Sequence, residues 1–274
     1  MSVVTAISIY PIKSCRGLSL DSARVEARGL QADRRYMVVD ANGHFVTQRQ
    51  FPKMALIELA QVDGGWSVSS PGHASIVIPT ALNPGEGGAT VCKVNIWRQA
   101  VEATLADPAT NLWLSSVMGF ACGLVYLADD QHRPVQNAAA EFDDEVSFAD
   151  GAPVLLISES SLSGLNEQLG APVSMAHFRP NIVVSADTPH AEDSWRDIAM
   201  GDTQFSVAWP CSRCVLTTVN PQTGERRSDR EPMQTLRTYR RRGQSVYFGQ
   251  NLLVRQPGAI AVGDRVEILS GVQE

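Results

Sequence analysis

The sequence is poor in cysteine and has no long hydrophobic run. Only 5 of its 274 residues are cysteines, an odd and sparse number that argues against the disulfide framework of a small secreted protein. No apolar run approaches the roughly 18 residues that a membrane-spanning helix needs. The N-terminus, Met-Ser-Val-Val-Thr-Ala-Ile-Ser, lacks the basic and apolar regions of a signal peptide. These absences predict a protein of the reducing cytoplasm with no membrane partner.

Basic residues are also fewer than acidic residues. Acidic residues number 29 against 23 lysines and arginines, so the formal net charge is −6. A general nucleic-acid binder needs a basic surface to neutralise phosphates, and the composition argues against that class of partner. Hydrophobic residues make up 44% of the chain and charged residues 19%, which excludes a disordered protein. The length fits one large domain or two small ones.

An apolar–polar alternation with a period of two dominates the chain, beginning with Thr5, Ile7 and Ile9 on one face. Asn42-Gly43 follows an apolar run and predicts a hairpin turn. The strands expected from this pattern cover residues 4–9, 35–40, 45–47, 55–62, 66–69, 73–78, 90–96, 124–127, 154–157, 182–185, 204–209, 215–219, 252–255 and 265–269.

Helices are expected only at residues 107–119, 158–170 and 231–241. Asp107 precedes a proline and predicts a helix start, and Gly119 predicts its end. Ser158 begins the second helix in the same way. Many short strands with few helices predict a mainly β fold with α decoration, as in barrels and sandwiches. The polar stretch 128–145 is the most plausible boundary between two parts.

Cys211 and Cys214 form a C-x-x-C pair for which four interpretations compete. A zinc site would need two further ligands, and the other cysteines and the histidines show no suitable spacing. A redox dithiol would need a helix after the first cysteine, whereas the strand-forming residues that follow predict none. One thiolate could bind a soft-ligand metal centre, with Arg213 favouring the charged sulfur. Both cysteines could also be packed as small buried hydrophobic residues.

Four motifs together identify a resemblance. The segment from Cys211 to Gly224, Cys-Ser-Arg-Cys-Val-Leu-Thr-Thr-Val-Asn-Pro-Gln-Thr-Gly, resembles the signature of MOSC-domain proteins. Tyr-Pro-Ile-Lys-Ser-Cys-Arg-Gly at 10–17, Asp-Arg-Arg-Tyr at 33–36 and Phe-Arg-Pro-Asn-Ile-Val at 178–183 agree in order and spacing. The likeness covers essentially the whole chain. It is strongest to the mitochondrial amidoxime-reducing components and their bacterial relatives.

The resemblance implies an N-terminal β-barrel domain at residues 1–127 and a MOSC β-barrel domain at residues 128–274. A molybdenum–molybdopterin cofactor (Moco) would lie between them. By carry-over from the family's motifs, Cys214 would be the catalytic residue and the metal ligand. The residues that would contact the rest of the cofactor are Lys13, Ser14, Arg34, Asp150, Arg179, Asn181, Ser212 and Arg213. Arginine suits the cofactor phosphate because its planar fork binds two oxygens at once.

The activity that the resemblance implies is reduction of small N-hydroxylated compounds by a molybdenum oxidoreductase. Some bacterial relatives continue into a ferredoxin-like iron–sulfur domain with a cysteine cluster, and these 274 residues contain no such cluster. The expected electron source is therefore a separate electron-transfer protein. The alternative is a cofactor carrier or sulfur-transfer module, as in the MOSC part of the molybdenum cofactor sulfurases.

Positive charge is concentrated in one segment. Residues 225–242 contain seven arginines against three acidic residues, a local charge of +4, so the rest of the chain carries −10. A solvated helix face would explain this concentration. A docking surface for an acidic electron-transfer partner and a patch that attracts anionic substrates are the functional alternatives.

Overall fold

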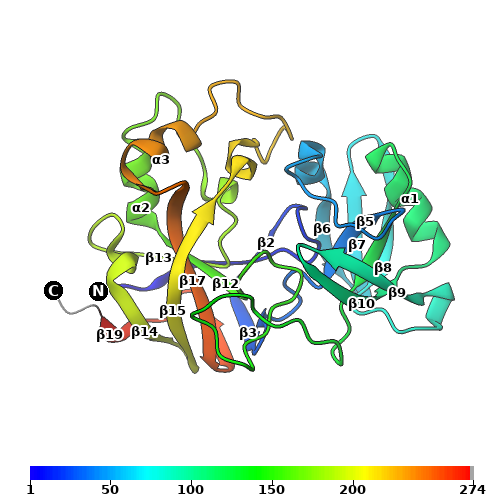
Figure 1. Cartoon of the computed structure of the whole chain (residues 1–274), viewed down its shortest axis with the longest axis horizontal. Helices are drawn as coiled ribbons and strands as arrows, with labels where there is room; N and C mark the ends of the chain where they lie inside the picture. The colour runs from blue at the N-terminus through cyan, green and yellow to red at the C-terminus, as the bar shows by residue number, and fades with distance from the viewer. Residues whose placement is uncertain (272–274) are drawn as a thin grey trace.

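The computed structural model describes residues 1–271, which form two lobes side by side (Figure 1). A nine-stranded sheet makes the framework of the lobe that contains both chain ends. Its strands, in spatial order, are β19 (Val266–Gly271), β14 (Trp195–Met200), β15 (Thr203–Arg213), β17 (Ser245–Gln256), β12 (Val154–Ser158), β13 (Ile182–Val184), β1 (Val4–Ile9) and β2 (Leu18–Leu20), with β16 (Arg241–Arg242) paired to β17.

The first strand of the chain belongs to this sheet of mostly C-terminal strands. β1 pairs antiparallel with β13, and Ile7 lies opposite Ile182. β3 (Ser22–Glu26) likewise joins β18 (Gly258–Ala261), and β4 (Gly29–Leu30) completes that small sheet. The turn after β1, which carries the first motif, is thereby held at the junction of the lobes.

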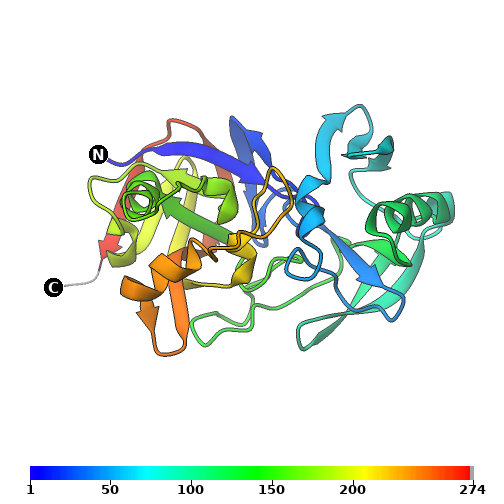
Figure 2. The same cartoon turned by 90° about the horizontal axis from the view of Figure 1, so that it is seen from above.

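The other lobe contains two antiparallel sheets and one long helix (Figure 2). The first sheet has the order β5 (Tyr36–Asp40), β11 (Cys122–Tyr126), β10 (Gln99–Leu105) and β9 (Thr90–Ile96), and the second has β6 (Glu58–Val62), β7 (Gly65–Ser70) and β8 (His73–Pro79). The helices of both lobes are α1 (Pro108–Met118), α2 (Glu159–Asn166) and α3 (Met233–Tyr239), with 3-10 turns η1 (Pro52–Leu56), η2 (Glu86–Gly88), η3 (Met175–His177), η4 (Ala191–Ser194) and η5 (Val215–Thr218). One apolar core, containing Val38 and Leu124 as well as Ile182 and Phe205, runs through both lobes.

The mainly β fold class with α decoration is confirmed, and within residues 1–271 the hydrogen-bonded strand order of each sheet is open. The helix expected at 107–119 is present: Asp107 Oδ1 accepts the backbone N–H groups of Ala109 and Thr110, and Gly119 ends it at a φ of 78°. No helix among the described residues is long and apolar enough to cross a membrane.

The strand expected at residues 215–219 was a wrong prediction, because this segment forms the 3-10 turn η5. Threonine hydroxyls explain the difference. Thr217 Oγ1 donates to the Cys214 carbonyl at 3.0 Å, and Thr218 Oγ1 donates to the Val215 carbonyl at 2.8 Å. Such local side-chain bonds to the backbone compete with a strand ladder, and β propensity alone does not reveal them.

Candidate functional site

A cavity of about 580 Å³ lies between the two lobes and is lined by residues of both. All nine residues that the motifs singled out line it, although they come from five separate parts of the chain. They are Lys13, Ser14, Arg34, Asp150, Arg179, Asn181, Ser212, Arg213 and Cys214. Gly151, Ala152 and Asn251 also border this space. The motif residues are therefore distant in the sequence but lie around one cavity in the fold.

Strained backbone is concentrated at this cavity. Ser14, Arg34 and Arg179 have φ angles of 70°, 48° and 57°, and Trp97, which also lines the cavity, has 53°. These are four of the seven non-glycine residues with positive φ in the described chain. This left-handed conformation is costly for residues with a side chain, and such strain persists mainly at functional sites.

An ion pair between the buried Lys13 and the half-exposed Asp150 forms one wall of the cavity. Nζ of Lys13 donates to the Phe148 carbonyl at 2.7 Å and pairs with the Asp150 carboxylate. Arg49 Nη1 donates to the other oxygen of Asp150 at 3.0 Å. Desolvation would raise the pKa of Asp150, but Lys13 and Arg49 outweigh it and hold this pKa far below its usual range. Burial lowers the pKa of Lys13 to about 8, although Asp150 opposes the shift.

The depressed pKa of Lys13 predicts a specific pH dependence of stability. The unfolded chain keeps the Lys13 proton up to its ordinary pKa of 10.5, while the folded protein loses it near 8. Between these values the unfolded state binds more protons, so the Lys13 contribution to stability rises with pH. We expect the unfolding free energy of the wild type, minus that of Lys13→Met, to increase by up to about 3 kcal/mol between pH 8 and 10.5.

Urea unfolding of the cofactor-free proteins across this pH range measures that difference. Subtracting the unfolding free energy of the variant from that of the wild type cancels the contributions of other groups that titrate in both proteins. A difference that stays flat, or that falls as pH rises, would show that Lys13 is not a desolvated ammonium.

Two arginines stack on one tyrosine at the other wall. The guanidinium centres of Arg34 and Arg179 each lie 4.2 Å from the centroid of the buried Tyr10 ring. Arg34 is held by Asp33, at 2.6 Å, and by Oδ1 of Asn181, at 3.0 Å. Asn181 is 2% exposed, and its amide also donates to the Ser8 carbonyl. Asn181 thus positions Arg34 as well as lining the cavity.

Arg179 carries a positive charge with unused hydrogen-bonding capacity. It is 9% exposed, and its Nη2 atom has no hydrogen-bond partner among residues 1–271. Burial and, to a smaller extent, the neighbouring Arg34 charge lower the pKa of this guanidinium to about 10, although Tyr10 opposes the shift. Nε of Arg213, a residue on the same cavity, also lacks a hydrogen-bond partner in the part of the chain that the structure describes. Buried unsatisfied donors are costly and rare, so these two point to an anionic ligand in the cavity.

The two cysteines of the pair differ in position. Cys211 lies in β15, where its sulfur accepts a bond from Arg213 Nη1 at 3.0 Å, and Cys214 follows the strand and is exposed to the cavity. Packing as a buried hydrophobic residue is therefore wrong for Cys214. Within residues 1–271 no group of three or more His, Cys, Asp or Glu side chains surrounds a metal position, which gives the zinc interpretation no support. Cys211 also lacks the helix that a redox dithiol requires.

Arg49 is a site residue that the sequence did not single out. Its guanidinium bonds to Asp150, stacks on Trp97 with its centre 4.8 Å from the ring centroid, and lines the same cavity as Cys214. Burial would lower its pKa, but Asp150 and then Cys214 raise it. Arg49 therefore links the Lys13–Asp150 pair to the exposed thiol. Nothing in its sequence neighbourhood distinguishes it from a surface arginine.

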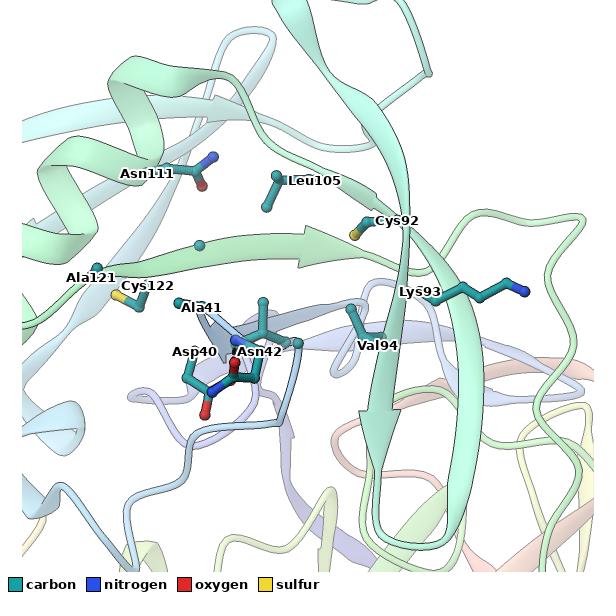
Figure 3. Close-up of a pocket in the computed structure, with 13 residues that line it drawn as sticks. Asp40, Ala41, Asn42, Cys92, Lys93, Val94, Leu105, Asn111, Ala121 and Cys122 are labelled. Atoms are coloured by element: carbon teal, nitrogen blue, oxygen red, sulfur yellow. Dashed lines mark hydrogen bonds between the residues drawn. The ribbon is translucent and has the colours of Figure 1, made fainter.

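A second hollow, of about 490 Å³, lies in the lobe of α1 and is shown in Figure 3. Cys92 of β9 and Cys122 of β11 border it, with Leu105 between them. Burial raises the pKa of both thiols, which makes them less reactive at neutral pH. None of the motif residues lines this hollow, so the candidate site is the cavity between the lobes.

The two-lobed β fold and the cavity at its junction define a MOSC protein with two domains. The family described as the MOSC N-terminal beta barrel domain matches residues 1–121, and the MOSC domain family matches residues 143–267. The chain belongs to the family of the mitochondrial amidoxime-reducing components. It is 33% identical to component 1 of Homo sapiens, over 98% of this chain and 83% of that protein, and 36% identical to component 1 of Xenopus laevis, over 97% and 82%.

Two more distant similarities accompany these. The molybdenum cofactor sulfurase of Oryza sativa subsp. japonica is 29% identical over 89% of this chain and 31% of that protein. The crystal structure of the YuaD protein from Bacillus subtilis covers 97% of this chain and 94% of its own, with a TM-score of 0.44 and 10% identity.

Proposed function

We propose that the cavity binds a molybdenum–pterin cofactor and that the protein is an oxidoreductase that removes oxygen from N-hydroxylated compounds. Electrons would come from a separate donor protein. One observation carries the proposal: the exposed Cys214 lines the same cavity of about 580 Å³ as Arg179 and Arg213, and each of these guanidinium groups has a buried nitrogen without a hydrogen-bond partner within residues 1–271. The amidoxime-reducing function in the names of relatives at 33–36% identity supports the reaction class.

The residues present fit such a cofactor. A pyranopterin carries an anionic phosphate and an anionic dithiolene, and Arg179, Lys13 and Arg213 supply buried positive charge on the same cavity. When bound, the cofactor supplies a metal that exchanges two electrons and takes oxygen from the substrate. Cys214 would be its protein ligand. Asp150 would fix both Lys13 and Arg49 on the wall of the cavity that Cys214 lines, by accepting their hydrogen bonds.

Metal and pterin analysis of the purified protein tests the cofactor before any substrate is chosen. After expression in a host that makes molybdenum cofactor, we expect about one molybdenum and one pterin per chain. Reduction of benzamidoxime to benzamidine, driven by dithionite-reduced methyl viologen, then tests the activity. Protein from a host that cannot make the cofactor is the control and is expected to show neither. A fully folded protein without metal or pterin would contradict the proposal.

The alternative function is a cofactor carrier or sulfur-transfer module, as the likeness to the rice sulfurase suggests. The same preparation distinguishes the two. A carrier would transfer its cofactor to a cofactor-free acceptor enzyme and would not reduce benzamidoxime, whereas the proposed reductase retains the cofactor through turnover. We further propose the cytoplasm as its location and a domain boundary at residues 127/128.

A further inference from the structure

The exposed arginines around α3 outnumber the carboxylates near them and form a basic surface. Two of the seven arginines in the basic segment are compensated: Arg227 pairs with Asp229 and Arg240 pairs with Asp193, each at 2.7 Å. The other five are exposed and make no ion pair within residues 1–271, and four of these border two hollows. These four, Arg226, Arg230, Arg237 and Arg241, are called the arginine surface below.

The arginine surface is continuous and contains two hollows. The larger, of about 510 Å³, is lined by Arg226, Arg230 and Arg237, and the smaller, of about 290 Å³, by Arg237 and Arg241. Arg237 belongs to both, so they adjoin. Val215 borders the larger hollow with 45% of its surface exposed. This apolar side chain follows Cys214 directly in the chain, so the arginine surface begins one residue from the proposed metal ligand.

The segment between η5 and α3 joins this surface to the other lobe (Figure 2). Arg16 donates to the Pro221 carbonyl at 2.8 Å, and Arg226 donates to the carbonyl of Arg49. Gly224, at a φ of 64°, lies against Lys53 and Leu56 of η1. These contacts fix the segment in place, so the arginine surface has a defined position beside the cavity.

The distribution of charge over the chain favours an acidic partner at the arginine surface. Residues 225–242 carry a net +4, and the remainder of the chain carries −10. An acidic protein is therefore attracted at the arginine surface and repelled by the charge of the remaining chain, which steers it to one orientation. Several arginines spread over two adjoining hollows match the carboxylates of a protein surface better than one small anion, which would occupy a single hollow.

We propose that the arginine surface docks an acidic electron-transfer protein and brings its redox group close to Cys214. This proposal rests on the proposed function, in which R–NHOH, two electrons and two protons give R–NH₂ and water. The electrons come from the docked donor and the protons from water. Val215 is an exposed apolar residue that borders the same hollow as three exposed arginines. An apolar centre with a polar, charged rim is typical of protein interfaces.

Charge reversal at positions without a structural role tests the docking. Arg230→Glu/Arg237→Glu is suitable because neither side chain makes a hydrogen bond or ion pair within the described residues. The matched control is Arg24→Glu/Arg265→Glu, two exposed arginines that likewise make no side-chain hydrogen bond or ion pair within the described residues and change the net charge by the same amount. The probe is an acidic [2Fe–2S] ferredoxin, whose binding to each holoenzyme is measured by calorimetry at low salt and in about 0.5 M NaCl.

We expect wild-type affinity for the ferredoxin to fall steeply with salt, and Arg230→Glu/Arg237→Glu to weaken it about tenfold or more at low salt. The control should stay within about a factor of two. Benzamidoxime reduction with ferredoxin should fall in the same proportion, whereas reduction with methyl viologen should be unchanged.

Each contrary result has a distinct meaning. Ferredoxin binding that is equal in all three proteins overturns the docking proposal. A raised KM for benzamidoxime with methyl viologen, confined to Arg230→Glu/Arg237→Glu, also overturns it and assigns the surface to small substrates. If the wild type does not reduce benzamidoxime even with methyl viologen, the proposed function itself fails.

Discussion

Cys214→Ala is expected to abolish benzamidoxime reduction while the protein stays folded and keeps much of its pterin. The side chain is exposed to the cavity and packs into no core, so its removal leaves no internal void. Residues that merely orient metal ligands cost about 10- to 100-fold in affinity or activity when removed, and loss of the ligand should exceed that. Turnover with methyl viologen, pterin content and thermal unfolding measure the three expectations separately.

The matched control is Cys211→Ser, three residues away on β15. Its sulfur accepts a hydrogen bond from Arg213, which a serine hydroxyl can also accept, and we expect most of the activity to remain. Wild-type turnover in Cys214→Ala would disprove the assignment of the ligand. Equal loss in both variants would mean that the two thiols act together.

The structure brings together residues that the sequence analysis grouped into one site, while their roles remain predictions. Four short motifs, separated by up to 140 residues or so, predicted a single site, and Lys13, Arg34, Arg179 and Cys214 do line one cavity. The motifs work because each holds a local backbone conformation, such as the positive φ of Ser14 and Arg179, that several residues must support. These backbone conformations depend on neighbouring residues, so a short stretch of sequence is enough to predict them.

What the sequence did not predict depends on contacts between distant segments. Arg49 lies outside the motifs, and its importance comes from Asp150, about 100 residues further along the chain, and from Cys214. The second role of Asn181, to hold Arg34, likewise requires the pairing of β1 with β13. No local sequence pattern predicts the contact between Arg49 and Asp150 or the contact between Asn181 and Arg34.

The secondary structure shows the same division. The helix at Pro108–Met118 was predicted because Asp107 and Gly119 are local signals for its two ends. The segment after Cys214 was assigned to a strand from its β-branched residues, and the hydroxyls of Thr217 and Thr218 instead bond to the backbone of their own turn. Membership of β1 in a sheet of C-terminal strands depends on long-range pairing, which periodicity alone does not specify.

Arg179→Met is expected to have opposite effects on the cofactor-free protein and on cofactor binding. The wild-type guanidinium is buried beside Arg34, with Nη2 unpartnered, so its charge destabilises the empty fold. Replacement of a poorly compensated buried charge by an apolar side chain of similar size should raise the unfolding free energy of the cofactor-free protein by about 1–3 kcal/mol. The same change removes charge-assisted hydrogen bonds to an anionic cofactor, worth about 1.5–3 kcal/mol, so molybdenum and pterin retention should fall at least about tenfold.

Arg133→Met is the control because Arg133 is also buried but is hydrogen-bonded through Nε and Nη1. Its Nη1 donates to the carbonyls of Ser147 and Ala149, each at 2.7 Å, and Nε donates to Gln99. Loss of these bonds should lower the unfolding free energy by about 1–3 kcal/mol, the opposite sign to Arg179→Met. Urea unfolding of both cofactor-free variants and of the wild type measures the sign of each change in unfolding free energy. If Arg179→Met also unfolds at lower urea than the wild type, then Arg179 supports the fold itself, and its unpartnered atom does not mark a place for an anion.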